Sequence, residues 1–221
     1  MPLSRRRRAC VLLLTVLLVS GCGADDWSDP HAKPTAVGAL GPGFIDPKAP
    51  PAPEATITPR PGSWDAVRPS KGYRVVLLTA GKDAPTKTMV GEVTKWAEQE
   101  DVSLKTVTAA NPHDFVPSIT RAMELAPDLI ICAGNDLVDA LALVTPSHLR
   151  RQFLVLGAEV AEPTHNVTAA DWTGASFRGE GLGMPDAYDP ATFTPERVAR
   201  AVRAGVAAVL NGITGIVIRL P

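Results

Sequence analysis

From residue 73 onward, β-rich runs alternate with amphipathic helical patterns, and this alternation constrains the fold more than any other feature. Residues 73–79 and 128–133 are rich in apolar and β-branched residues, and the second run is nearly all apolar, as expected for a strand covered on both faces. Between them, residues 86–100 repeat apolar side chains at helical spacing, and residues 102–108 read as a second strand. Such alternation predicts a parallel sheet with helices on both faces.

The rest of the chain continues the pattern. Helices are expected from Asn111 to Pro127, from Gly134 to Pro146, and from a Thr194 cap to Asn211-Gly212. Further strands are expected over residues 153–157, 167–170 and 213–219. Right-handed crossovers leave only a few doubly wound orders. We therefore expect an α/β, doubly wound, mostly parallel sheet in a three-layer αβα sandwich, with strand order 2-1-3-4-5.

The fold class also places a candidate site. In doubly wound sheets, ligands bind beyond the carboxyl ends of the strands, where the strand order reverses. Here Lys82 and Asp83 follow the first strand, and Gly134, Asn135 and Asp136 follow the third. Free N–H groups at the start of the helix that follows would point into this crevice. We expect a ligand-binding site at these residues, with Asp136 serving the helix start; turn chemistry alone is the alternative.

The first 22 residues have the layout of a secretory signal. Four arginines at residues 5–8 precede an apolar run of about a dozen residues, which is too short for a bilayer that needs roughly 20. Ser20-Gly21 before Cys22 resembles the bacterial lipobox, whose cysteine is acylated after cleavage. We expect residues 1–21 to be a lipoprotein signal peptide, Cys22 to carry palmitate-type chains, and the protein to lie on the extracytoplasmic face of a bacterial cell membrane. An ordinary cleaved signal with an incidental Cys22 is the alternative.

Residues 22–72 predict a tether. Ten prolines lie between residues 25 and 72, with few branched apolar residues, and such a segment gains little from burial. We expect a lipidated N-terminus followed by a disordered linker spanning roughly 40 Å, in which Trp27 and Trp64 are unpacked. The folded part would then be a single domain at residues 73–221.

Residue patterns typical of catalysis are missing from the sequence. The formal net charge is −1, so no nucleic-acid partner is expected. The four histidines are isolated, no phosphate-binding loop occurs, and Ser176 lacks the glycine spacing of a nucleophile elbow. Cys132 lies in an apolar run and reads as a buried thiol. We expect no enzyme activity, no metal and no cofactor. An envelope hydrolase is the least favoured interpretation, and clustering of Glu159, Asp171 and Glu180 in space would favour it.

Four segments, in order, resemble a known family: Ala-Pro-Asp-Leu-Ile-Ile-Cys-Ala-Gly at 126–134, Phe-Leu-Val-Leu-Gly-Ala-Glu at 153–159, Asn-Val at 166–167 and Ser-Phe-Arg-Gly-Glu-Gly-Leu-Gly at 176–183. They are similar to the first lobe of the basic membrane lipoprotein (BMP) family. These are extracytoplasmic substrate-binding proteins of ABC transporters, and several bind nucleosides.

The resemblance implies a single lobe of a type I periplasmic binding protein. It further implies a non-catalytic module for a small, nucleoside-like ligand, with an ABC permease as partner. Asp83 matches a ligand-gripping aspartate of the family, and Glu159, which ends the second segment, joins the candidate ligand-binding residues. The family has a second lobe where this chain has about 38 residues after Gly183. The alternative is therefore an envelope structural or interaction lipoprotein that has lost ligand binding and has an envelope protein as partner.

Overall fold

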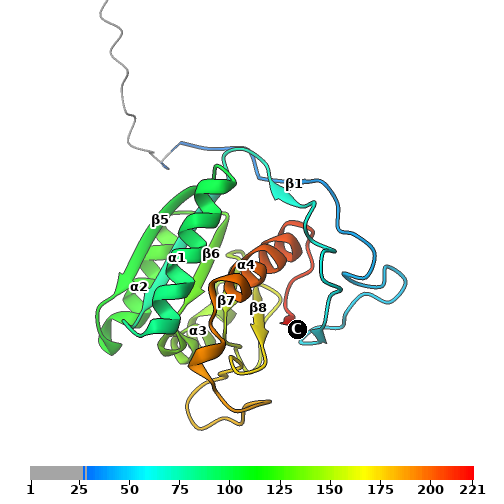
Figure 1. Ribbon diagram of the computed structural model, residues 1–221. Coiled ribbons are helices and arrows are strands. Elements are labelled where there is room, and N and C mark those ends of the chain that lie inside the picture. The colour runs from blue at the N-terminus through cyan, green and yellow to red at the C-terminus, as the bar shows by residue number, and fades with distance from the viewer. Residues whose placement is uncertain (1–26, 28) are drawn as a thin grey trace, which may run out of the picture.

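One seven-stranded parallel sheet organises this computed structural model, which describes residue 27 and residues 29–221 (Figure 1). Its order is β2-β9-β8-β7-β6-β4-β5, and every neighbouring pair is parallel. The strands are β2 (Thr56–Ile57), β4 (Arg74–Ala80), β5 (Ser103–Ala109), β6 (Leu129–Ala133), β7 (Phe153–Leu156), β8 (Val167–Trp172) and β9 (Val217–Leu220). Counted from β4, the order is 2-1-3-4-5, so the predicted topology is confirmed. The expected signal peptide and Cys22 lie outside the described residues.

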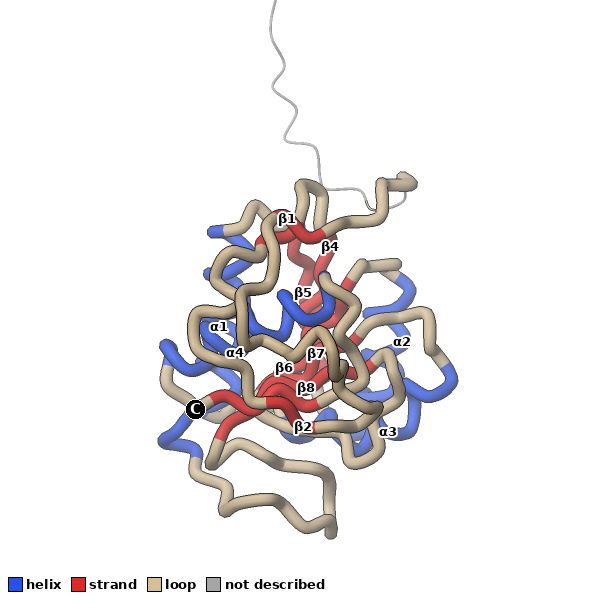
Figure 2. The backbone as a smooth tube through the Cα atoms, turned by 90° about the vertical axis from the view of Figure 1, so that its right-hand side faces the viewer, coloured by secondary structure: helices blue, strands red, loops and turns tan. Residues whose placement is uncertain are grey.

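Helices cover both faces of the sheet, as the edge-on view in Figure 2 shows. α1 and α4 pack together on one face and α2 and α3 on the other. Successive residues of β4 serve the two layers, since Leu77 lies in the core under α1 and Leu78 in the core under α2. The three-layer αβα prediction is confirmed. The helices are α1 (Ala84–Gln99), α2 (Phe115–Glu124), α3 (Val138–Val144) and α4 (Pro195–Leu210), with 3₁₀ turns η1 (Pro112–Asp114), η2 (Asn135–Leu137), η3 (Thr145–Ser147) and η4 (Pro190–Thr192).

Side-chain caps explain where two helices begin. The Thr194 hydroxyl accepts a hydrogen bond from the Arg197 amide (3.3 Å), as predicted for α4. The Asp83 carboxylate caps α1 in the same way, so this helix starts two residues earlier than predicted. The last strand starts four residues later than predicted, because Gly212 and Gly215 have positive φ angles of 72° and 71° and form the turn before it.

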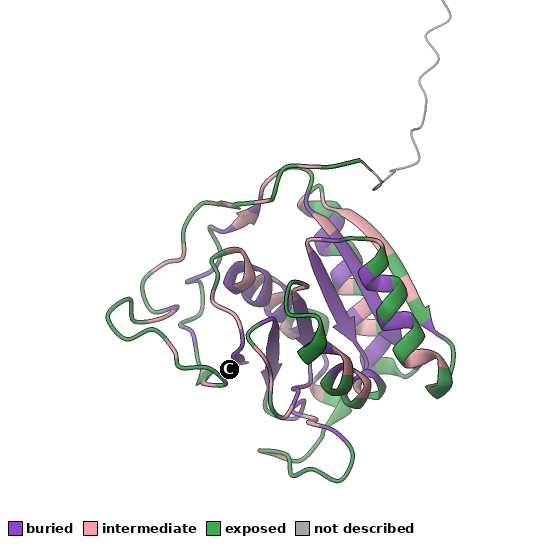
Figure 3. Cartoon of the chain, turned by 180° about the vertical axis from the view of Figure 1, so that it is seen from behind, coloured by how far each residue is buried: buried purple, intermediate pink, exposed green. Residues whose placement is uncertain are grey.

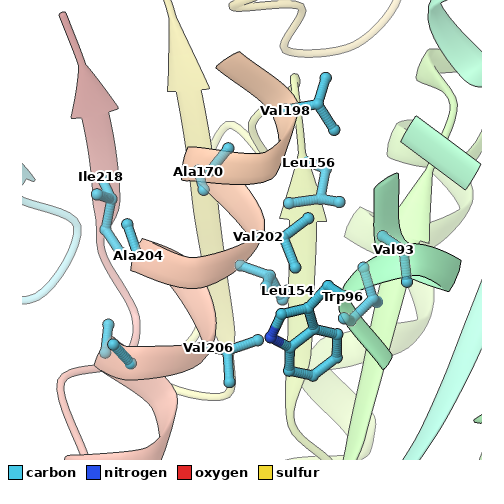
Figure 4. Close-up of a cluster of buried hydrophobic side chains, with 14 of the residues drawn as sticks. Val93, Trp96, Leu154, Leu156, Ala170, Val198, Val202, Ala204, Val206 and Ile218 are labelled. Atoms are coloured by element: carbon cyan, nitrogen blue, oxygen red, sulfur yellow. The ribbon is translucent and has the colours of Figure 1, made fainter. Parts of the chain in front are cut away.

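The α4 face that touches the sheet is made of valines and alanines. Val198, Val202 and Val206 point toward β7, β8 and α1, as Figure 4 shows. Arg203 on another face of α4 pairs with Glu100 at the end of α1 at 3.0 Å, which links the two helices on this side of the sheet.

The segment expected to be a disordered linker packs on the domain over its described residues. Trp64 is 3% exposed and Phe44 2%, and their rings meet edge to face at 6.3 Å within the core under α1 and α4. β2 pairs with β9 through Thr56 and Ile57, and β1 (Ala36–Val37) pairs with β3 (Arg68–Pro69). The linker prediction was wrong for this segment. Its strand β2 pairs with the outer edge of β9, and its aromatic side chains join the core under α1 and α4.

Trp27 is also packed, contrary to the prediction. It is 6% exposed, its Nε1 donates to the Ser103 hydroxyl (2.9 Å), and the Arg74 guanidinium donates to its carbonyl oxygen (3.1 Å). The Lys105 ammonium lies 4.5 Å from the centre of its ring. The described chain thus begins docked against the starts of β4 and β5. None of its helices is both long and apolar enough to span a bilayer.

Candidate functional site at the carboxyl edge of the sheet

A cavity of about 810 Å³ lies at the carboxyl edge, the end of the sheet at which the strands finish. It is built from the segments that follow β4, β5 and β6 and from the loop after β8. This is the reversal of strand order at which the site was expected. Its size falls in the usual range for small-molecule pockets. Its lining residues are Gly81, Lys82, Thr108, Ala109, Ala110, Asn111, Pro112, Phe115, Asn135, Asp136, Asp139, Ala140, Phe177 and Glu180.

The structure brings together three of the six predicted ligand-binding residues. Lys82, Asn135 and Asp136 line the cavity. Asp83 does not line it, because its carboxylate accepts from the Thr86 amide (2.9 Å) and the Thr86 hydroxyl (2.8 Å) at the start of α1. Glu159 lies in a different cluster, described below.

Gly134, the sixth predicted residue, shapes the site rather than lining it. Its φ angle is 124°, and a Cβ there would lie 2.4 Å from the Ala80 carbonyl oxygen. Only glycine lets the ends of β4 and β6 come this close. The short distance between these strand ends brings Lys82 and Asp136 to one cavity.

Asp136 lies in the first turn of η2, where an acid is favoured, but its side chain forms no cap hydrogen bond. η2 and α3 have no side-chain cap, and Asp136 is exposed. Lys82 is exposed as well, and neither side chain has a hydrogen-bonding or ionic partner among the described residues. Both charged groups are therefore available to a ligand.

Two aromatic residues and the loop after β8 complete the wall of the cavity. Phe115 at the start of α2 and Phe177 after β8 are half-buried. The Asp139 carboxylate of α3 accepts from the Glu180 amide at 3.2–3.3 Å, so the loop after β8 is tied across the cavity. Phe115 follows the second predicted strand, so its place at the carboxyl edge could be inferred from the sequence. The place of Phe177 depends on the path of the loop after β8, which no local sequence pattern predicts.

Glu159 belongs to a second group of side chains, the Arg219 cluster, which consists of Glu159, Asp171, Ser176, Arg178, Asp186 and Arg219. Arg219 on β9 contacts Asp186 (2.9 Å), Asp171 (3.1 Å) and Glu159 (3.4 Å), and donates to the Ser176 hydroxyl (2.8 Å). Arg178 also reaches Glu159 (3.3 Å). The sequence signal for this cluster was an arginine inside an apolar strand, which requires buried partners.

Glu159 and Asp171 converge in space, whereas Glu180 lines the cavity instead. Burial raises the pKa of the Asp171 carboxyl to about 8, together with the hydrogen bond and negative charge of Glu159, while Arg219 opposes the shift. Asp171 is 0% exposed. Its Oδ2 contacts Arg219, whereas its buried Oδ1 has no hydrogen-bond partner among the described residues; Glu159 contacts both Arg219 and Arg178. This arrangement joins the loop after β8 to β9, and Ser176 has arginine and aspartate partners rather than a histidine.

Two further features bear on the interpretation. Within the described part of the chain, no group of three or more His, Cys, Asp or Glu residues has the geometry to hold a metal ion. A second groove, of about 870 Å³, runs through the N-terminal segment and is lined mainly by apolar residues such as Leu40, Phe44 and Ile45. It lacks the mixed charges of the carboxyl-edge cavity.

Comparisons with known proteins place the chain among distant structural neighbours. No family model and no curated protein matches it. Similar solved structures include an ABC transporter system solute-binding protein from Aeropyrum pernix K1 (TM-score 0.42, 18% identity, covering 46% of this chain and 29% of that chain). They also include a fragment described as a lipoprotein from Peptoclostridium difficile 630 (0.46, 15%, 63% and 98%) and an ABC transporter system solute-binding protein from Conexibacter woesei DSM 14684 (0.39, 14%, 46% and 36%).

The chain therefore spans less than a third of the Aeropyrum protein's length. At these identities and scores the likeness concerns part of the fold. Membership of the BMP family stays a prediction.

Proposed function

We propose that this protein is a lipid-anchored, extracytoplasmic, non-catalytic binding module, built as a single substrate-binding lobe of the BMP type. The observation that carries the proposal is the cavity of about 810 Å³ at the reversal of strand order, with the unpaired charges of Lys82 and Asp136 on its wall. Doubly wound folds bind their ligands at this position.

The ligand that fits this wall best is small, partly planar and rich in hydroxyl groups, as a nucleoside is. Phe115 and Phe177 offer aromatic surface to a planar base. Asn135 supplies amide donors and an acceptor, and the Asp136 carboxylate accepts from hydroxyl groups. An ABC permease would be the partner that receives the ligand.

Titration calorimetry with adenosine, guanosine, uridine and cytidine tests this binding. We expect one of them to bind the wild-type protein, and the Asp136→Asn and Lys82→Gln variants to bind it about tenfold or more weakly. Lys87→Gln is the matched control, because Lys87 is also exposed, on α1, but lies outside the cavity. No heat from any nucleoside, with and without a candidate permease, would refute ligand binding at this site.

The lipid anchor is supported by the sequence layout around Cys22. Intact mass measurement of the N-terminal peptide, together with radiolabelled palmitate, tests it. We expect label in the wild-type protein and none in Cys22→Ala, which should leave the membrane fraction. Retention of Cys22→Ala equal to the wild type would contradict the anchor.

One observation favours the second candidate, an envelope interaction lipoprotein without a ligand. The polar side chains of the cavity wall are largely exposed, including Lys82, Asp136, Asp139 and Glu180, so this lobe alone does not enclose a small molecule as most pockets do. That function predicts co-purification with an envelope protein and no shift of melting temperature with any of the four nucleosides.

A further inference from the structure

We infer that the amino edge of the sheet, at which the strands begin, is the surface that faces the membrane, and that its loop at residues 145–152 meets anionic phospholipid headgroups. The inference rests on the proposed lipid anchor and goes beyond it, because it assigns an orientation and a contact surface.

The first step is the place where the described chain begins. Trp27 is buried against the start of β5 through Ser103 and against the start of β4 through Arg74. In Figure 1 the blue start of the described chain lies at the upper end of the sheet, and the yellow-orange loop that follows β8 lies at the lower end. The attachment point of the chain and the cavity are therefore at opposite ends of the strands.

The chain between Cys22 and Trp27 is short compared with the length of the sheet. Five residue steps separate Cys22 from Trp27, and a fully extended chain covers at most about 18 Å in five steps. β4 has seven residues, which correspond to about 23 Å along the strand. If the cavity faced the membrane, Trp27 would stand farther from the surface than an acylated Cys22 can reach. This reach excludes the orientation in which the cavity faces the bilayer, and the docked Trp27 makes the amino edge the end of the sheet nearest to the anchor.

The third step is the chemistry of that edge. α3 ends, and β7 begins, beside the loop at residues 145–152. Two large apolar side chains are exposed here, Leu143 (74%) and Leu149 (43%). Arg150 and Arg151 lie between them and β7, and neither forms an ion pair with a described acid. Exposed apolar residues beside unpaired arginines suit an anionic membrane surface.

Other charged residues lie at this end of the sheet too: Asp101 before β5, Glu124 at the end of α2, and the lysines Lys33 and Lys71. The loop at residues 145–152 differs from them because its two arginines lie beside exposed leucines. The orientation follows from the tether, and the headgroup contact follows from the loop, so each can be tested separately.

Fluorescence quenching tests the orientation. A fluorophore is attached at Lys71→Cys or at Lys82→Cys, two exposed positions that flank β4 at its two ends. Cys132 stays unlabelled because it is buried and burial raises its thiol pKa. The lipidated protein is placed in vesicles of phosphatidylcholine and phosphatidylglycerol that contain a headgroup-nitroxide lipid. We expect at least twofold quenching at position 71 and almost none at position 82.

The outcomes separate the inference from the proposed function. Equal quenching at both positions, in a preparation whose mass shows acylated Cys22, overturns the orientation alone. An unacylated Cys22 overturns the anchor and, with it, the orientation that depends on it.

The headgroup contact has its own arm, with the fluorophore at Leu149→Cys. We expect the Arg150→Gln/Arg151→Gln pair to reduce quenching at least twofold in phosphatidylglycerol vesicles. Lys87→Gln/Arg197→Gln removes the same charge near the starts of α1 and α4, at the other end of the sheet, and should leave quenching at position 149 unchanged. Equal quenching in the arginine double variant and in the control double variant would overturn the inferred contact with headgroups.

Discussion

Gly134 determines how closely the ends of β4 and β6 approach, and hence whether the cavity forms. In Gly134→Ala, the new Cβ would meet the Ala80 carbonyl oxygen at 2.4 Å, and alanine would have to adopt a φ angle of 124°. We expect a loss of about 3 kcal/mol in the free energy of unfolding, measured by urea denaturation.

Gly91→Ala is the control for that change. Gly91 lies inside α1, and a Cβ there would meet nothing within 4 Å. This variant should gain about 0.5–1 kcal/mol, because alanine suits a helix better than glycine. Equal destabilisation by both substitutions would show that the close approach of the two strands is not real.

The proton on Asp171 gives the protein a stability that depends on pH. Its folded-state pKa of about 8 lies above the usual value for an aspartate, so the folded state holds a proton that the unfolded chain has lost. This contribution is complete below about pH 4 and is lost as pH rises toward 8. We expect Asp171→Asn to flatten the fall in unfolding free energy between pH 5 and pH 8, measured by urea titrations. The same slope in wild type and Asp171→Asn, with the exposed Asp65→Asn as reference, would refute this.

At the residue scale, the sequence predicted what depends on neighbours along the chain. Lys82, Asn135 and Asp136 follow strands directly, so their meeting at one edge follows from parallel pairing. Phe177 and Glu180 reach the cavity only because the Arg219 cluster and Asp139 hold a loop in place. The contacts of Arg219 with the acids and the contact of Asp139 with Glu180 join residues 30 or more positions apart, and no periodicity in the sequence predicts them.

At the scale of elements, the N-terminal segment is the critical case. Trp64 is buried against the core and packs on Phe44, so Trp64→Ala should lower the free energy of unfolding by about 3 kcal/mol. Val37 in the same segment is 53% exposed, and Val37→Ala should change it by less than about 0.5 kcal/mol. Guanidinium denaturation compares the two. If Trp64→Ala is as mild as Val37→Ala, the segment is a loose tether after all.

The elements differ in how far local sequence specifies them. β4 and β6 are long apolar runs, and Figure 3 shows them as buried strands inside exposed loops. β2 has two residues in a proline-rich stretch, and it pairs with β9 about 160 residues later. Its strand character comes from that distant edge rather than from its own residues, so the sequence suggested a linker instead.

At the scale of the whole molecule, we assign different roles to the two ends of the sheet. The amino edge takes the tether and a basic, apolar loop, and the carboxyl edge holds the cavity. A lobe mounted in this way presents its cavity away from the bilayer, where a ligand or a partner can reach it. The N-terminal segment closes the β9 side of the same domain.

Hydrogen–deuterium exchange on the lipidated, vesicle-bound protein tests whether a ligand binds at the carboxyl edge. The protein is compared with and without a mixture of adenosine, guanosine, uridine and cytidine at 5 mM each. We expect slower exchange in peptides covering residues 81–84, 109–115 and 134–140, and no change over residues 40–58, which include the lining of the other large groove. Unchanged exchange throughout, or protection confined to residues 40–58, would contradict a binding site at the carboxyl edge.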